Sequence, residues 1–324
     1  MEKCRGQGYD GAAAMSGEKN GVQKIVQDEF PAAVYVHCSS HVLNLSLEKG
    51  SKITEINACV TTMKEVINFF RESSKRTDFL ANVCREMSDD DMQYSDGRLV
   101  KMCPTRWVEN QEVTENFVKQ YQPILEACSR IAQGALDSDA AGKALNFQRT
   151  LASETFLFSL FTLSHFLTTT RPLSTLLQAS DMDVYRAMQS ISTCEASIAS
   201  NREDSSFSSI YDKVQSVLGE DVEISTPRVC SRQTKRSNPP ADNAFDYYRR
   251  AIYLPYLDTV VSQLHERFAK HQKIFKGLFS LLPSVLLEDD PDPSTITDLA
   301  SFYKSQLPGD GAALLAEWNR WTLF

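Results

Sequence analysis

Several hallmarks of common protein classes are missing from this 324-residue sequence. Its most apolar run, residues 156–167, is short and carries polar interruptions, whereas a bilayer-spanning helix needs about 20 apolar residues. The eight cysteines include no CxxC pair, and no signal peptide precedes them. We therefore expect no membrane insertion, reduced thiols, and a location in the nucleus or the cytoplasm.

Phosphate-binding and nucleophilic motifs are missing as well. The sequence contains neither GxGxxG nor GxxxxGK(S/T), so no glycine-rich loop is predicted to cradle phosphates. Among its five histidines, none stands in a Ser/His/Asp arrangement with a nucleophile context. The sequence therefore predicts no small-molecule substrate.

Positive charge is in short supply. Lys and Arg number 34 against 42 Asp and Glu, which gives a net charge of −8 and a pI of about 5.3. The field of the whole molecule repels a nucleic-acid backbone, so any such contact must come from a local basic or aromatic patch. The composition, 42% hydrophobic and 23% charged, is that of a globular chain with one elaborated domain or two ordinary ones.

The amino-terminal stretch has the layout of a polar site at the carboxyl ends of neighbouring strands. Residues 1–10 read as a strand that runs into a small-residue loop after Asp10, and residues 33–37 read as a short buried strand. A helix that ends before Pro31 separates them, and a second helix ends at Gly50. This order is typical of an α/β core, whose first strands are expected to be missing here through truncation or deletion.

Helical periodicity dominates the remaining residues. From Ile53 to Phe70 apolar residues recur in steps of three and four, and similar patterns follow up to the carboxyl terminus. Residues 102–107 are predicted to be irregular and exposed, and the Ser-rich, basic segment 201–243 is predicted to be a linker. We therefore expect an α/β plus mostly helical fold, with domains at residues 1–50, 51–243 and 244–324.

Two candidate sites lie in the amino-terminal stretch. An Asp in a small-residue loop can hold a divalent metal, although the commoner role of a residue such as Asp10 is to stabilise a turn before Gly11. Cys38 and His41 share a helical face and could be zinc ligands. Zinc needs four ligands and no second pair at zinc spacing follows, so a packed thiol and a hydrogen-bonded histidine are the commoner outcome.

Other candidates lie in the helical part. Arg106 beside Trp107 suits phosphate contact with base stacking, or simply packing of a loop onto the domain. Glu317, on the last helix, reads by itself as a surface glutamate near the aromatic anchor Trp321. A basic run could bind nucleic acid or direct nuclear import, although most such runs are solvated linkers. It consists of Arg228, Arg232, Lys235 and Arg236.

Taken in order, several motifs resemble the hAT transposase superfamily, and in particular its domesticated groups of the zinc-finger MYM-type proteins and of the repressor of the inhibitor of the protein kinase. The motifs are RGQGYDGAAAMSG, VHCSSHVLNL, CPTRW, YYRRAIYLPYLDTVVSQLHERF and LLAEWNRW. The resemblance implies a ribonuclease-H-like core interrupted by a large all-helical insertion. In that family three carboxylates bind two divalent ions, Mg or Mn, for strand cleavage and transfer.

Residue by residue, the resemblance assigns roles to the candidates. Asp10 matches the second catalytic acid and metal ligand, and Glu317 matches the third through a shorter motif. Cys38 and His41 match the family's CxxH, and Arg106 with Trp107 its RW element, which handle the DNA end and the flipped base.

The departures lead to the functional expectation. The first acid, an amino-terminal zinc-finger reader and a carboxyl-terminal dimerisation segment are all expected to be absent, and two-metal chemistry fails without its first carboxylate. We expect a catalytically inactive protein without a cofactor, which interacts in the nucleus with DNA, with protein partners or with a second copy of itself. The alternatives are a fragment of an active transposase and a helical scaffold that does not bind DNA.

Overall fold

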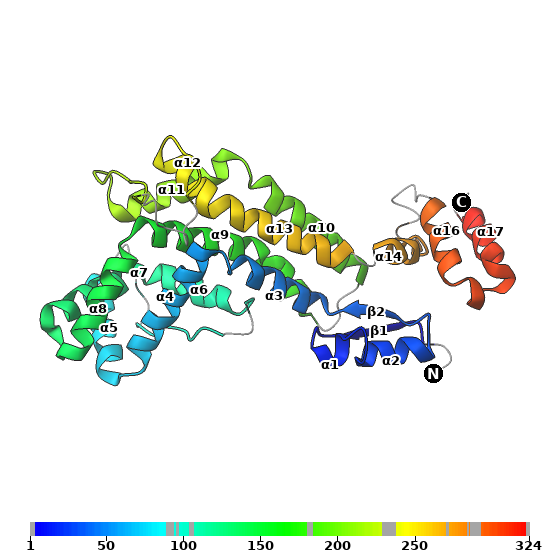
Figure 1. Ribbon diagram of the computed structural model, residues 1–324, viewed down its shortest axis with the longest axis horizontal. Helices are drawn as coiled ribbons and strands as arrows, with labels where there is room; N and C mark the ends of the chain where they lie inside the picture. The colour runs from blue at the N-terminus through cyan, green and yellow to red at the C-terminus, as the bar shows by residue number, and fades with distance from the viewer. Residues whose placement is uncertain are drawn as a thin grey trace. The chain divides into compact units, whose positions relative to one another are not determined.

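The computed structural model describes residues 4–88, 94, 97–103, 107–179, 184–228, 238–269, 272–283, 285 and 293–321, which are mostly helical with one small two-stranded sheet (Figure 1). The chain divides into two compact units. Unit 1 comprises Met1–Leu43, Leu176–Ile191 and Leu264–Phe324, and unit 2 comprises Asn44–Thr175 and Ser192–Gln263. The mostly helical class is confirmed, whereas the ribonuclease-H-like core and the predicted boundaries at residues 50 and 243 stay predictions.

The sheet of unit 1 consists of β1 (Gly6–Tyr9) and β2 (Val34–His37), which pair in parallel. The register runs from Gly6 opposite Val34 to Tyr9 opposite His37. Parallel strands need a crossover connection, and here it contains α1 (Ala13–Ser16) and α2 (Val22–Glu29). Both predicted strands and the helix that ends before Pro31 are therefore confirmed. The second strand was predicted to be buried, but only Val34 in it is buried, and Tyr35, Val36 and His37 are partly exposed.

Helix α3 (Ser39–Gly50) follows β2 and leads into the helices of unit 2. In α4 (Thr54–Arg71), the apolar positions Ile56, Met63, Ile67 and Phe70 are buried, as their spacing predicts. The helices that follow, including the π-helical segments η1 and η2, are α5 (Ser74–Met87), α6 (Asn110–Lys119), α7 (Tyr121–Arg130), η1 (Ile131–Ala135), α8 (Ser138–Leu151), α9 (Glu154–Leu177), α10 (Val184–Ser200), α11 (Asp204–Leu218), α12 (Ala244–Tyr248), η2 (Arg249–Tyr253) and α13 (Leu254–Ala269).

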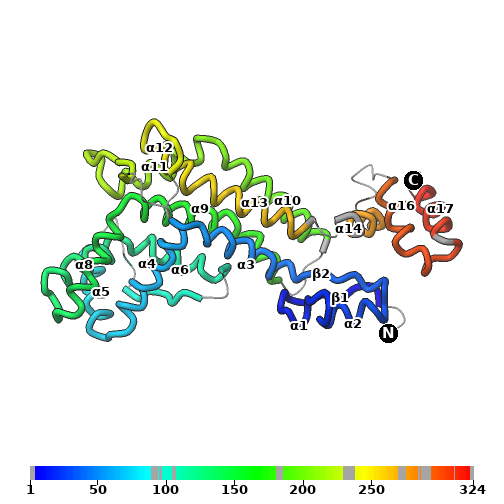
Figure 2. The backbone as a smooth tube through the Cα atoms, in the orientation of Figure 1, coloured from blue at the N-terminus to red at the C-terminus, as the bar shows by residue number. Residues whose placement is uncertain are grey.

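Helices α9 and α13 run side by side in unit 2 (Figure 2), and a cluster of aromatic rings where they meet forms part of the core of this unit. Tyr248 stacks on Phe158 with ring centroids 4.1 Å apart, and Tyr253 and Tyr256 each lie 5.3 Å from Phe166. These tyrosines belong to the YYRRAIYLPY motif, so that motif is a core element.

Pro255 explains the π-helical segment just before α13. A proline has no backbone N–H, and its ring clashes with the carbonyl group four residues earlier, which here is that of Ala251. The wider π-helical turn at Arg249–Tyr253 relieves this clash, so the helical path continues into α13.

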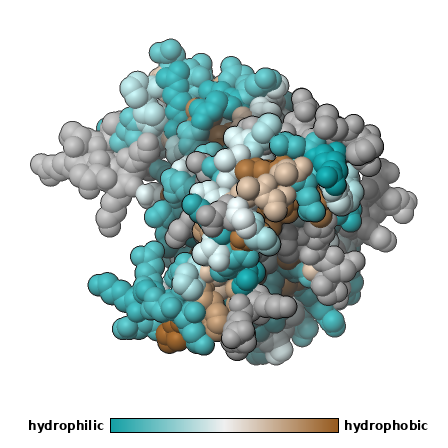
Figure 3. Space-filling model, turned by 90° about the vertical axis from the view of Figure 1, so that its right-hand side faces the viewer, coloured by the Kyte–Doolittle hydropathy of each residue, from teal (hydrophilic) through white to brown (hydrophobic). Residues whose placement is uncertain are grey.

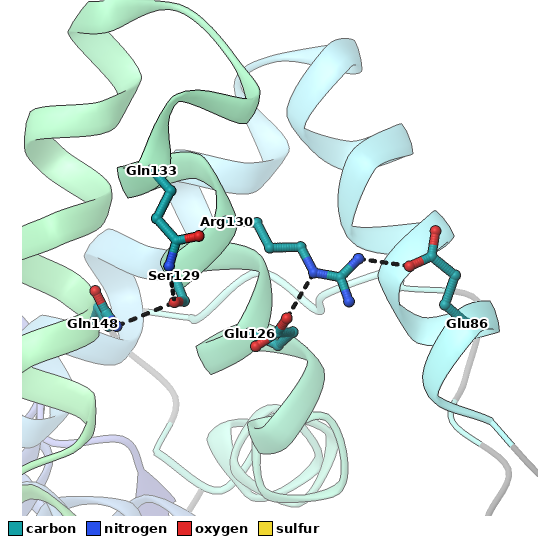
Figure 4. A network of polar contacts seen from close by, with 6 residues as sticks. All are labelled: Glu86, Glu126, Ser129, Arg130, Gln133 and Gln148. Carbon is teal, nitrogen blue, oxygen red and sulfur yellow. Dashed lines mark hydrogen bonds and ion pairs between the residues drawn. The ribbon is translucent and has the colours of Figure 1, made fainter.

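A polar network ties three helices of unit 2 together at the surface (Figure 4). The Arg130 guanidinium on α7 lies 2.6 Å from a carboxylate oxygen of Glu86 on α5 and 2.6 Å from one of Glu126 on its own helix. Gln148 on α8 donates to the Ser129 hydroxyl at 3.2 Å. Exposed pairs of this kind stabilise the fold only slightly. They show which faces of α5, α7 and α8 lie next to one another.

The carboxyl-terminal helices of unit 1 are α14 (Gln272–Phe279), α16 (Pro293–Phe302) and α17 (Ala312–Trp321), with the 3₁₀ turns η3 (Lys304–Gln306) and η4 (Pro308–Gly311) between the last two. Trp318 is 5% exposed and its indole N–H donates to the Ser280 carbonyl at 3.1 Å, whereas Trp321 is 59% exposed. The aromatic anchor of α17 is therefore Trp318, and the expectation for Trp321 was wrong.

The side of the molecule that faces the viewer in Figure 3 carries small apolar patches among mostly polar surface. In the described ranges, no helix combines the length and the apolar character that a membrane crossing requires.

Two expectations for loops are corrected by the structure. Part of the predicted linker 201–243 is helix α11, because Phe207, Ile210 and Val214 lie at steps of three and four and are buried. The predicted exposure of residues 102–107 is also wrong at Met102 and Trp107, each of which is 7% exposed. Burial of these side chains outweighs the polar character of their sequence neighbours.

Candidate functional site

The strand register brings two predicted residues to the same edge of the sheet. Because Tyr9 lies opposite His37, Asp10 and Cys38 are the first residues beyond the paired carboxyl ends, and the Cys38 N–H donates to the Tyr9 carbonyl at 2.9 Å. Both side chains are exposed. Burial raises the pKa of the Tyr35 phenol, a hydrogen bond with Ser16 opposes this, and the charges of Asp10 and Cys38 raise it further.

Asp10 stabilises the loop that it begins. Its Oδ1 accepts the Ala12 N–H at 3.1 Å, and its backbone carbonyl accepts the Tyr35 hydroxyl at 3.3 Å. This is the turn-forming role that such a residue commonly has. The carboxylate nevertheless lies at the surface, at the carboxyl edge of the sheet.

Gly11 allows two histidine rings to approach the loop closely. A Cβ atom at Gly11 would lie 2.8 Å from the His37 ring atoms Cε1 and Nε2 and 3.0 Å from His41 Nε2. The rings of His37 and His41 stack with centroids 5.1 Å apart and an interplanar angle of 29°. Position 11 therefore needs a residue without a side chain.

These histidines extend a series of stacked rings along the strands. Tyr9 and Tyr35 lie 6.2 Å apart, and Tyr35 and His37 lie 6.3 Å apart. We call Tyr9, Tyr35, His37 and His41 the ring row; all are partly exposed. Sequence reasoning missed the row because Tyr9 comes from a different strand, although the alternation of Tyr35 and His37 was a signal that they share a face.

A metal site would need several donor side chains at one place. In the parts of the chain with described coordinates, no group of three or more His, Cys, Asp or Glu side chains could hold a metal ion. The assignment of Asp10 and Glu317 as metal ligands stays a prediction.

Two asparagines of unit 2 hold Cys103 and Trp107, the described residues of the CPTRW motif. The Asn44 Oδ1 on α3 accepts the backbone N–H of Trp107, and also that of Val108 at 3.4 Å. Asn110 Oδ1 accepts the Cys103 N–H at 2.9 Å while its Nδ2 donates to the Cys103 carbonyl at 3.0 Å. The Trp107 indole is thus part of the packing. Arg106 lies outside the described residues.

Glu317 and the basic run were predicted to contribute to the site as well. Glu317 is exposed on α17, and within the described residues no hydrogen bond or ion pair joins it to Asp10. Arg228 is exposed, whereas Arg232, Lys235 and Arg236 lie outside the described residues. The roles predicted for these residues stay predictions.

Comparison with known proteins finds distant similarity along the whole chain. The chain is 25% identical over 338 residues to the 52 kDa repressor of the inhibitor of the protein kinase of Mus musculus, and 24% identical over 330 residues to that of Homo sapiens. Both alignments cover 100% of this chain but 43% of the relative, so the chain spans less than half the length of the curated relatives it matches. No family model matches, and no solved structure matches.

Proposed function

We propose that this chain is part of a transposase-derived protein of the hAT superfamily and that it binds nucleic acid through the edge of its small sheet. The observation that carries the proposal is the ring row beside Cys38, at the carboxyl ends of two parallel strands. Partly exposed rings offer stacking surfaces to unpaired bases. The distant similarity to the 52 kDa repressors supports the assignment to a transposase-derived group.

Binding is tested with a labelled single-stranded oligonucleotide at several salt concentrations. Loss of a base stacked on a ring costs about 1–3 kcal/mol, so Tyr9→Ala or His41→Ala should weaken binding about tenfold or more. Trp321→Ala, which removes an exposed aromatic residue of α17, is the matched control and should leave the affinity unchanged. Equal affinities in all variants, or no binding by the wild type, would contradict the proposal.

We further propose that the chain binds without catalysing strand transfer. Support comes from the Asp10 carboxylate, which accepts the Ala12 N–H within its own turn, and from the lack of a three-donor group among the described side chains. The test is a strand-transfer assay on hairpin and nicked DNA with Mg²⁺ or Mn²⁺. Clear activity that Asp10→Ala abolishes would make the chain a fragment of an active two-metal enzyme instead.

A nuclear location is the third part of the proposal. Its support is the basic run, in which cations cluster within a short stretch of an otherwise acidic chain. A fluorescent fusion should accumulate in the nucleus and lose that accumulation when Arg232, Lys235 and Arg236 are replaced by Ser. A fusion that stays in the cytoplasm before any replacement would contradict it.

A further inference from the structure

A cavity of about 900 Å³ lies in unit 2 between the end of α11 and the start of α12. Its walls combine aromatic side chains with the loop that follows α11. Ligand sites in proteins commonly have volumes of about 300–1,000 Å³, so this cavity is large enough to receive side chains of another molecule. It lies in a different unit of the chain from the sheet edge with its ring row.

Hydrogen bonds hold the loop that forms one side of the cavity. The Gln215 side chain donates to the carbonyls of Gly219 and Val222, at 2.8 and 2.7 Å. Further along, the Tyr248 hydroxyl donates to the Ser225 carbonyl at 3.0 Å, and the Ser225 hydroxyl donates to Glu154 at 3.1 Å. These hydrogen bonds hold the loop at both ends, so less conformational entropy of the loop is lost when a ligand binds.

Aromatic rings form an apolar part of the cavity lining. Tyr211 on α11 and Phe245 on α12 lie with ring centroids 5.4 Å apart at an angle of 49°. Phe207 supports Phe245 from the buried side, at 4.9 Å and 72°. Val222, which is 44% exposed, adds a further apolar side chain to the lining.

The charged side chains in the described part of the cavity lining are all acidic. Glu220, Asp221, Glu223 and Asp242 line the cavity, and among the described lining residues there is no Lys, Arg or His. In the described part of the chain, none of these carboxylates takes part in an ion pair. Their field attracts cations and repels phosphates, so this cavity does not suit the nucleic acid proposed for the sheet edge.

We propose that this cavity is a docking site for a basic segment of a partner protein, with an Arg or Lys side chain inserted between the rings and the carboxylates. The apolar stem of such a side chain would pack on Tyr211, Val222 and Phe245. Its charged head would lie against an aromatic face and near the carboxylates, an arrangement that stabilises guanidinium and ammonium groups. The acidic charge of the lining and the hydrogen bonds that hold the loop both favour binding of a basic side chain.

The experiment measures binding of a fluorescent, extended peptide of alternating Arg and Ser to the full chain by anisotropy. The double variant Asp221→Asn/Glu223→Gln keeps the shape of the loop and removes charge, and it should weaken binding about tenfold. The matched control, Asp212→Asn/Glu72→Gln, removes the same charge from exposed positions outside the cavity lining and should bind as the wild type does. A peptide with Glu in place of Arg should not bind.

Three outcomes would overturn the proposal. The first is no binding of the Arg peptide to the wild type, and the second is equal weakening in both double variants, which would indicate attraction by net charge alone. The third is binding that appears only after Arg232, Lys235 and Arg236 are replaced by Ser, which would make the chain's own basic run the occupant. Circular dichroism of each variant checks that it is folded.

Discussion

The side-chain oxygen of Asn44 accepts the backbone N–H of Trp107, which lies 63 positions further along the chain. This contact joins Trp107 of the CPTRW motif to the helix that begins directly after Cys38. Two motifs that are far apart in sequence are thus connected through one asparagine, and Asn110 forms hydrogen bonds with Cys103 of the same motif. The VHCSSHVLNL motif therefore has a structural role besides any functional one.

Replacing Asn44 with Ala should destabilise unit 2. The substitution leaves the buried Trp107 N–H without its acceptor, and an unsatisfied buried donor costs about 1–3 kcal/mol. Urea denaturation should show a decrease of that size in the free energy of unfolding. The matched control is Asn57→Ala at an exposed position of α4, and an Asn44→Ala variant as stable as this control would contradict the prediction.

Gly11→Ala should disturb the strand edge, whereas Gly6→Ala should not. A methyl group at position 11 would lie 2.8 Å from the His37 ring, but a Cβ at Gly6 would meet nothing within 4 Å. Overpacking of this kind costs about 1–3 kcal/mol. Amide hydrogen exchange of β1 and β2 should accelerate in Gly11→Ala alone, and equal exchange in the two variants would count against the close approach of the His37 ring to the loop.

Tyr256→Phe should preserve or increase stability, whereas Tyr253→Phe should decrease it. Among the described atoms, the buried Tyr256 hydroxyl has no hydrogen-bond partner, but the Tyr253 hydroxyl donates to the Asn201 carbonyl at 2.8 Å. Loss of such a bond costs about 0.5–1.5 kcal/mol, while removal of an unsatisfied hydroxyl costs nothing. Thermal unfolding of both variants measures the difference, and the opposite order of melting temperatures would refute it.

Alkaline pH should destabilise the protein. Burial raises the pKa of Cys128 to about 12. Burial also raises the pKa of Cys194, and together with the negative charge of Glu195 it brings this pKa to about 11. Unfolded thiols ionise near about pH 8.5, so stability is fully present below that pH and is lost as the pH rises toward the folded values. The melting temperature should fall between about pH 8.5 and 10.5, and less steeply in Cys194→Ala. A melting temperature that rises over this range would contradict the prediction.

Local patterns predicted the elements whose burial is periodic. The helix at α4 followed from apolar steps of three and four, and the strands at β1 and β2 followed from short runs that end at Asp10 and Cys38. Their side-by-side placement at one sheet edge was also a prediction from the order strand, helix, strand, helix. The positions of these helices and strands depend on residues that are close in sequence, so the local sequence pattern is enough to predict them.

Features that depend on distant residues could not be predicted. Trp107 was predicted to be exposed because the residue that accepts its backbone hydrogen bond, Asn44, lies 63 positions earlier in the chain. Helix α11 is a different case, because the local spacing of Phe207 and Ile210 does predict a helix and only the serines around them favoured a linker. The cavity beside Phe245 combines α11 with α12, and the intervening residues carry no sign that these helices meet.

The two-stranded sheet of unit 1 leaves room for further strands to pair with it. In the part of the chain with assigned structure, β1 and β2 pair only with each other, so each strand is an edge with one row of backbone N–H and C=O groups turned outward. A further extended segment, from this polypeptide or another, could join either side. Such an addition would widen the sheet while Asp10 and Cys38 stay adjacent at its end.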